Sequence, residues 1–98
     1  MREVVIAGIG QIPVGEHWDL SLRNISARAV QAAKKDAGGL LPEALYIGNL
    51  IASVASHQAN LGALVTDNTF LEGIESFTVE AGEASAAAAF RLAYLAVA

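Results

Sequence analysis

Residues 79–86 decide how this chain folds, and they read Val79-Glu80-Ala81-Gly82-Glu83-Ala84-Ser85-Ala86. The residues that lead into this stretch have the pattern of a buried strand, and the alanine-rich residues that follow have the pattern of an apolar helix. The stretch therefore predicts a sharp strand-to-helix turn with a carboxylate, Glu83, in the first turn of the helix. α/β enzymes commonly place a nucleophile at such a turn.

The helix predicted over residues 83–97 has no polar face. After Glu83, its apolar surface is interrupted only by Ser85, Arg91 and Tyr94. A helix that is apolar on all sides is buried on all sides, and no other part of these 98 residues could surround it. Its pattern continues to the last residue without the glycine, asparagine or basic turn that closes many helices. We therefore expect residues 1–98 to be one partial domain, the truncated N-terminal piece of a longer protein.

Composition agrees with an incomplete core. Hydrophobic residues make up 54% of the chain, charged residues only 16%, and the mean hydropathy is +0.45. A free-standing domain of this size has a large wetted surface and needs more polar residues to cover it. Much of the apolar surface is therefore expected to meet something outside this chain.

Several function classes are disfavoured by the same composition. The net charge of −4 and the scattering of six basic residues leave no basic stripe for nucleic acid. The absence of cysteine excludes disulfides and thiolate metal sites within the chain. His17 and His57 lack the spacing of metal ligands, so we expect no metal. No signal peptide and no apolar run of membrane-spanning length is present, which predicts a cytoplasmic protein without membrane contact.

Strand and helix patterns alternate along the whole chain. Residues 4–9, most of which are β-branched, predict a central strand covered on both faces. Ser21 is the expected N-cap of a helix that stops at Gly38-Gly39. Further segments predict a strand over residues 44–48, a helix from Ser56 or His57 to residues 67–68, a strand over residues 76–79 and the helix over residues 83–97. Such alternation implies parallel strands with right-handed crossovers, so the predicted class is α/β.

Taken in order, these segments resemble the N-terminal half of the thiolase superfamily. Residues 79–86 resemble the family's nucleophile turn, Val-x-x-x-Cys-Ala-Ser-Gly, with Glu83 at the position of the cysteine. Residues 2–8 with Pro13 and Gly15 resemble its opening strand and turn, although the basic residue of that turn is absent. Residues 47–49 resemble its Gly-Asn strand end, and the downstream Gln58 and Asn60 resemble its Gln-Asn helix at looser spacing. The likeness spans nearly the whole chain.

The resemblance implies an incomplete N-terminal half of a layered fold in the order β-α-β-α-β-α, with a largely parallel sheet whose last strands are missing. It implies a parent protein that transfers acyl groups between coenzyme A thioesters and binds no permanent cofactor. The family's second half, with its histidines and second cysteine, lies beyond these residues. The family dimerises through its third strand, which corresponds here to Ser76, Phe77, Thr78, Val79 and Glu80. The archaeal and bacterial subgroup that works with a small acyl-CoA-binding partner subunit is the most similar.

Glu83 allows two interpretations. A carboxylate attacks a thioester far more weakly than a thiolate does, and its acyl product would be an easily hydrolysed mixed anhydride. Glu83 could therefore form a transient anhydride, act as a base, or mimic an acylated cysteine in a decarboxylating relative. The alternative is an acid that satisfies the first turn of a helix, although burial of that helix would make an idle carboxylate costly.

Other candidate sites are weaker. Gly8 lies near the end of the predicted strand and Gly10 follows it, but Gly15 comes too late for a dinucleotide-binding loop. Ser85 has no nearby histidine that could activate it as a nucleophile. Two function classes remain, a thiolase-type acyltransferase with altered chemistry and a catalytically silent homologue that serves as a scaffold or partner subunit.

Overall fold

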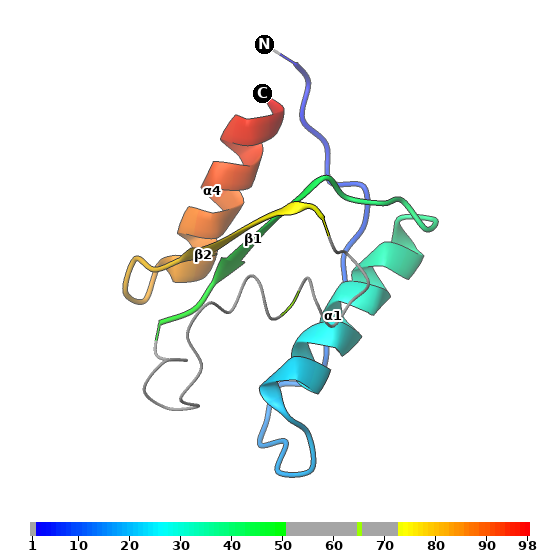
Figure 1. The fold of residues 1–98 in the computed structure, drawn as a ribbon, viewed down its shortest axis with the longest axis vertical. Helices are drawn as coiled ribbons and strands as arrows, with labels where there is room; N and C mark the ends of the chain where they lie inside the picture. Colours follow the sequence, from blue (N-terminus) through cyan, green and yellow to red (C-terminus); the bar gives the residue numbers. More distant parts are fainter. Residues whose placement is uncertain (1, 51–64, 66–72) are drawn as a thin grey trace.

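The computed structural model describes residues 2–50, Val65 and residues 73–98. In these parts of the chain the elements are α1 (Leu22–Asp36), β1 (Ala44–Gly48), β2 (Glu75–Val79) and α4 (Ser85–Val97). The two strands form one sheet, α4 packs on it, and α1 lies to one side (Figure 1). This small α/β arrangement agrees with the predicted class.

β1 and β2 pair in parallel, as the sequence predicts. The register runs from Ala44 opposite Glu75 to Gly48 opposite Val79. The ladder continues past the end of β1, where the N–H of Asn49 donates to the carbonyl of Val79 at 3.2 Å. Both strands therefore end at the same edge of the sheet.

One aromatic pair reinforces the two strands. Tyr46 and Phe77 are register partners, and their rings stack with centroids 5.2 Å apart and planes inclined by 15°. Such cross-strand aromatic pairs stabilise a sheet beyond the area that they bury.

α1 begins and ends as its sequence predicts. The hydroxyl of Ser21 accepts a hydrogen bond from the N–H of Asn24 at 3.1 Å, which caps the helix. At the other end, Gly39 lies in the left-handed region (φ +84°), and its N–H donates to the carbonyl of Lys34 at 2.9 Å. Lys34 and Lys35 add positive charge to the last turn, where the helix dipole favours it.

The prediction of a central strand over residues 4–9 is wrong for this structure. The segment forms no strand, and the side chains of Val5, Ile6 and Ile9 are 71%, 68% and 72% exposed. The N–H of Ile9 donates to Oδ2 of Asp36 at 2.9 Å, so the segment is held by α1. Residues 6–8 and the start of β1 line a common apolar hollow of about 340 Å³, so the segment lies near β1 without pairing to it. A β-branched run favours burial, but a strand also needs a partner backbone.

α4 packs closely on the end of β1. A Cβ added to Gly48 would overlap the backbone carbonyl of Ser85 and come within 2.7 Å of the nitrogen of Ala86. The sheet-facing residues Ser85 and Ala89 are 5% and 6% exposed, and their small side chains allow this approach. Glycine is therefore the residue that fits at position 48.

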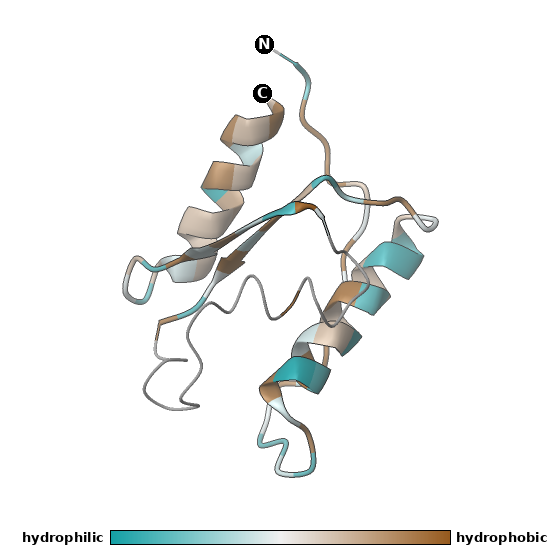
Figure 2. Ribbon diagram, viewed as in Figure 1, coloured by the Kyte–Doolittle hydropathy of each residue, from teal (hydrophilic) through white to brown (hydrophobic). Residues whose placement is uncertain are grey.

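The outer face of α4 is not covered within the described residues. Phe90 is 62% exposed, and Leu95 is 52% exposed. Figure 2 shows that α1 carries strongly hydrophilic residues whereas α4 is mainly apolar along its length. The expectation that this chain cannot surround the helix stays a prediction, because residues 51–64 and 66–72 are not among those described. The helix predicted from residue 56 to residues 67–68 lies outside the described residues, apart from Val65, which is 1% exposed.

We predict that the 98-residue chain expressed alone self-associates and is not a stable monomer, because so much apolar surface is in contact with water. Analytical ultracentrifugation should give a mass above that of the monomer, with strong binding of a hydrophobic dye. A monomeric mass combined with a sharp cooperative melt would contradict this expectation.

We predict that Gly48→Val loosens α4, because the new side chain must displace the backbone of Ser85. Overpacking of this kind costs about 1–3 kcal/mol, so trypsin cleavage after Arg91 should accelerate by roughly fivefold or more. The matched control is Ala87→Val, which places the same side chain at an exposed position of the same helix. Equal cleavage rates in the two variants would show that the close contact does not hold α4.

Candidate functional site

The turn between β2 and α4, residues 80–84, lies at the carboxyl edge of the two-stranded sheet. Two backbone hydrogen bonds close it, from the N–H of Ala84 to the carbonyl of Ala81 at 3.1 Å and from the N–H of Ser85 to the carbonyl of Gly82 at 3.2 Å. Gly82 adopts a left-handed conformation (φ +59°) that glycine reaches without strain. The sharp strand-to-helix turn predicted from the sequence is present.

Ser85 supplies the side-chain bonds of this turn. Its hydroxyl accepts from the N–H of Ala81 at 2.9 Å and donates to the carbonyl of Gly82 at 2.7 Å. The proton of the hydroxyl is therefore engaged in a hydrogen bond to a backbone carbonyl. Sequence reasoning missed this structural role. The available signal was a serine three residues after a turn glycine, a spacing at which hydroxyls bond to the backbone.

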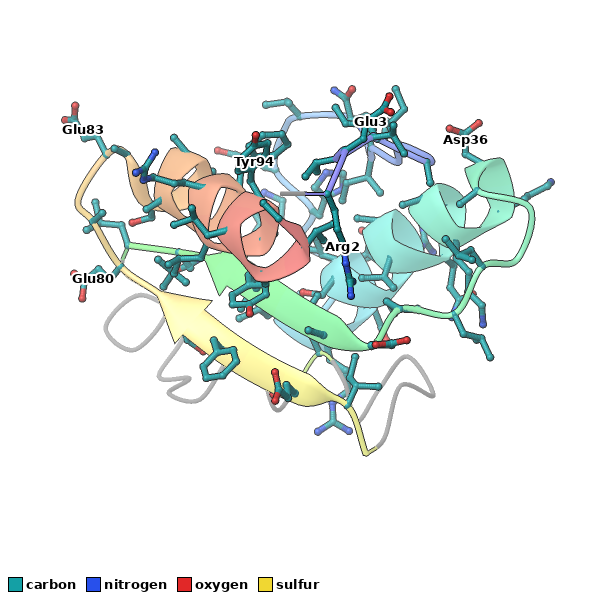
Figure 3. All side chains as sticks on the ribbon, turned by 90° about the horizontal axis from the view of Figure 1, so that it is seen from above. Arg2, Glu3, Asp36, Glu80, Glu83 and Tyr94 are labelled. Atoms are coloured by element: carbon teal, nitrogen blue, oxygen red, sulfur yellow. The ribbon has the colours of Figure 1, made fainter. Side chains whose placement is uncertain are left out.

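Glu83 lies outside α4, and this corrects the predicted start of the helix. α4 begins at Ser85 with Ala84 as its N-cap, and its first turn contains no acidic residue. The side chain of Glu83 is exposed, and Figure 3 shows Glu80 and Glu83 both pointing outward from the turn. The argument that burial makes an idle carboxylate costly therefore does not apply in the described structure.

Several predicted features do meet at this edge. Glu83 and Glu80 come from the turn, and Asn49 joins them because its N–H bonds to Val79 at the end of the ladder. In open α/β sheets, ligands bind outside the carboxyl ends of parallel strands, and the N-terminus of α4 adds a favourable potential for anions there. The edge has the general layout of an α/β binding site.

Other predicted residues lie elsewhere. His17 is in the loop before α1, and its Nε2 is 2.8 Å from the carbonyl oxygen of Pro13. His57, Gln58 and Asn60 lie outside the described residues. Among the residues that the structure describes, no group of three potential metal ligands occurs. A search of the same residues finds no helix long and apolar enough to cross a membrane.

The strand expected to form a dimer interface is β2. Four of the five expected residues, Ser76, Phe77, Thr78 and Val79, belong to the strand, and Glu80 is the first residue of the turn. β1 is the only strand paired to β2 within the described part of the chain. One edge of β2 therefore has no paired strand among the described residues, and its role in a dimer stays a prediction.

Known proteins that match this chain include two acetyl-CoA acetyltransferases. No protein-family model matches the sequence. The acetyl-CoA acetyltransferase of Methanothermobacter thermautotrophicus is 38% identical over 100 residues, which cover all of this chain and 26% of that protein. The acetyl-CoA acetyltransferase of Methanocaldococcus jannaschii is 36% identical over 102 residues, again covering all of this chain and 26% of the relative.

The chain thus spans about a quarter of the length of the curated relatives that it matches. Its α/β elements, its parallel strand pair and its strand-to-helix turn are consistent with part of a thiolase fold. From its sequence and its fold, the chain is a partial thiolase-like chain, homologous to acetyl-CoA acetyltransferases.

Proposed function

We propose that the chain is the N-terminal part of a thiolase-like acyl-CoA acyltransferase in which Glu83 stands at the position of the nucleophile. The observation that carries the proposal is the turn 80–84, which leads from the end of a parallel strand into an apolar helix with residue 83 just before the N-cap. The name of the two relatives supports coenzyme A thioesters as the substrate class.

The chemistry at Glu83 would differ from that of a cysteine enzyme. If the carboxylate attacks a thioester carbonyl, an acyl–oxygen bond forms, the carbon–sulfur bond breaks, and coenzyme A leaves as a thiolate that takes a proton from water. Water then cleaves the mixed anhydride, which releases the carboxylic acid and restores the carboxylate of Glu83. The net reaction would be thioester hydrolysis, and Claisen condensation would be disfavoured. The other roles open to Glu83 are those of a base and of a mimic of an acylated cysteine.

A catalytically silent homologue is the second candidate. The exposure of Glu83 favours it, because a hydrated carboxylate is a weak nucleophile. In that case the protein would serve as a scaffold or as a partner subunit of an active enzyme.

The proposed partners follow from the same resemblance. The substrate would be an acyl-CoA, and no cofactor would be bound permanently. The full-length protein would form a homodimer or larger oligomer through Ser76, Phe77, Thr78, Val79 and Glu80, and it could bind a small acyl-CoA-binding subunit.

We predict that Glu83→Cys in the full-length protein creates a thiol that an alkylating reagent or an acyl-CoA labels selectively. The position beside the N-terminus of α4 should lower the pKa of a thiol and raise its reactivity near neutral pH. Glu43→Cys is the matched control, because residue 43 is also an exposed glutamate, and it precedes β1, outside both the 80–84 turn and the proposed dimer strand. Mass spectrometry gives the labelling rate at each position.

Glu83→Ala should lower any native acyl-CoA turnover by about a hundredfold or more if the carboxylate acts as a nucleophile or base. Turnover is measured by release of free coenzyme A. Full activity of the alanine variant, together with equal labelling of the two cysteine variants, would rule out the nucleophile position.

We also predict that Thr78→Pro weakens the dimer of the full-length protein, because proline removes a backbone N–H from β2 and cannot serve in a strand-to-strand ladder. Thr78→Ala keeps that N–H and is the control. Sedimentation velocity at low concentration should show more monomer for the proline variant alone. If the fraction of monomer is unchanged in both variants, the dimer interface does not include β2.

A further inference from the structure

Ser85 is the only buried polar side chain among the described residues. It is the first residue of α4 and is 5% exposed. Its hydroxyl makes one bond as acceptor and one as donor, both to the turn that precedes it. A buried hydroxyl with both bonds directed at one turn fixes the geometry of that turn.

The hydrogen bonds of Ser85 reach back across residue 83 to the two residues that precede it, Ala81 and Gly82. The N–H of Ala81, before residue 83, bonds to the hydroxyl, and the carbonyl of Gly82 receives both the hydroxyl and the N–H of Ser85. None of these bonds uses the side chain of Glu83, which points outward (Figure 3). Removal of the hydroxyl would therefore release the turn without touching the chemical group at position 83.

The sheet holds Ser85 in place from behind. Gly48, at the end of β1, lies so close to the backbone of Ser85 that not even a methyl group fits between them. The start of α4 therefore cannot shift toward the sheet, and the hydroxyl remains directed at the turn. The rigid sheet edge is thus linked to residue 83 through Ser85.

We propose that Ser85 is a positioning residue, whose buried hydroxyl holds residue 83 at the N-terminus of α4 by tying Ala81 and Gly82 together. The role in chemistry rests on the function proposed for position 83. The positioning itself is a property of the turn and is measurable without acyl-CoA turnover.

The test uses the full-length protein with Glu83→Cys as a reporter, and it measures the pH dependence of alkylation by iodoacetamide. When Ser85 is unchanged, the midpoint should lie below that of the Glu43→Cys control. Adding Ser85→Ala should raise the midpoint toward the control by about one pH unit and slow labelling at pH 7 by nearly tenfold, because residue 83 is no longer held beside the helix terminus. Ser85→Thr, which keeps the hydroxyl, should restore the lower midpoint.

Two further variants separate positioning from stability. Ser26→Ala removes a hydroxyl that also donates to a backbone carbonyl, that of Leu22 at 2.9 Å in α1, and should leave the midpoint unchanged. Ala81→Pro removes the backbone N–H that donates a hydrogen bond to the hydroxyl of Ser85. It should raise the midpoint as Ser85→Ala does. It therefore tests the same bond if the Ser85→Ala protein does not fold, which circular dichroism would reveal.

The possible outcomes are distinct. A low midpoint that neither Ser85→Ala nor Ala81→Pro changes overturns the positioning role but leaves the proposed function intact. A midpoint equal to that of the control in every background overturns the positioning role, and together with full activity of Glu83→Ala it also overturns the proposed function. A midpoint that rises only when a hydrogen bond of Ser85 is lost supports the positioning role, even if acyl-CoA turnover does not depend on Glu83.

Discussion

The backbones of β1 and α4 meet at Gly48 and Ser85, and the rest of the site depends on this contact. No side chain separates the two elements there, so the helix axis is set by the strand itself. Ala89, one turn further on, continues the contact with another small side chain. Helices that approach this closely gain dispersion contacts along their whole inner face, and a small increase in volume pushes them apart. The direction of the β2–α4 turn follows from that fixed axis.

Local signals in the sequence were sufficient for the type and order of the four elements in the described residues. Ser21 caps α1, residues after Asp36 end it, and both strands lie within a residue of their predicted limits. Each of these features depends on neighbours in the chain, which is why it can be read from the sequence. The turn at residues 80–84 belongs to the same group, because a strand pattern gives way there to a helix pattern within a few residues.

Features that depend on distant partners were harder to predict. Residues 4–9 have the composition of a central strand, but the partner of Ile9 is the carboxylate of Asp36, 27 residues away. Glu83 was expected to lie inside the helix, and it lies just outside because the hydroxyl of Ser85 and the conformation of Gly82 determine where α4 begins. A shift of two residues in a helix start is small for the fold, but it changes a buried carboxylate into an exposed one.

The separation between the side chain at position 83 and the bonds that build its turn has an evolutionary consequence. The turn is held by backbone groups and by Ser85, so an exchange of residue 83 leaves every one of these bonds in place. Such a scaffold lets a lineage lose, replace or regain its reactive group by a single substitution, without first rebuilding the protein around it.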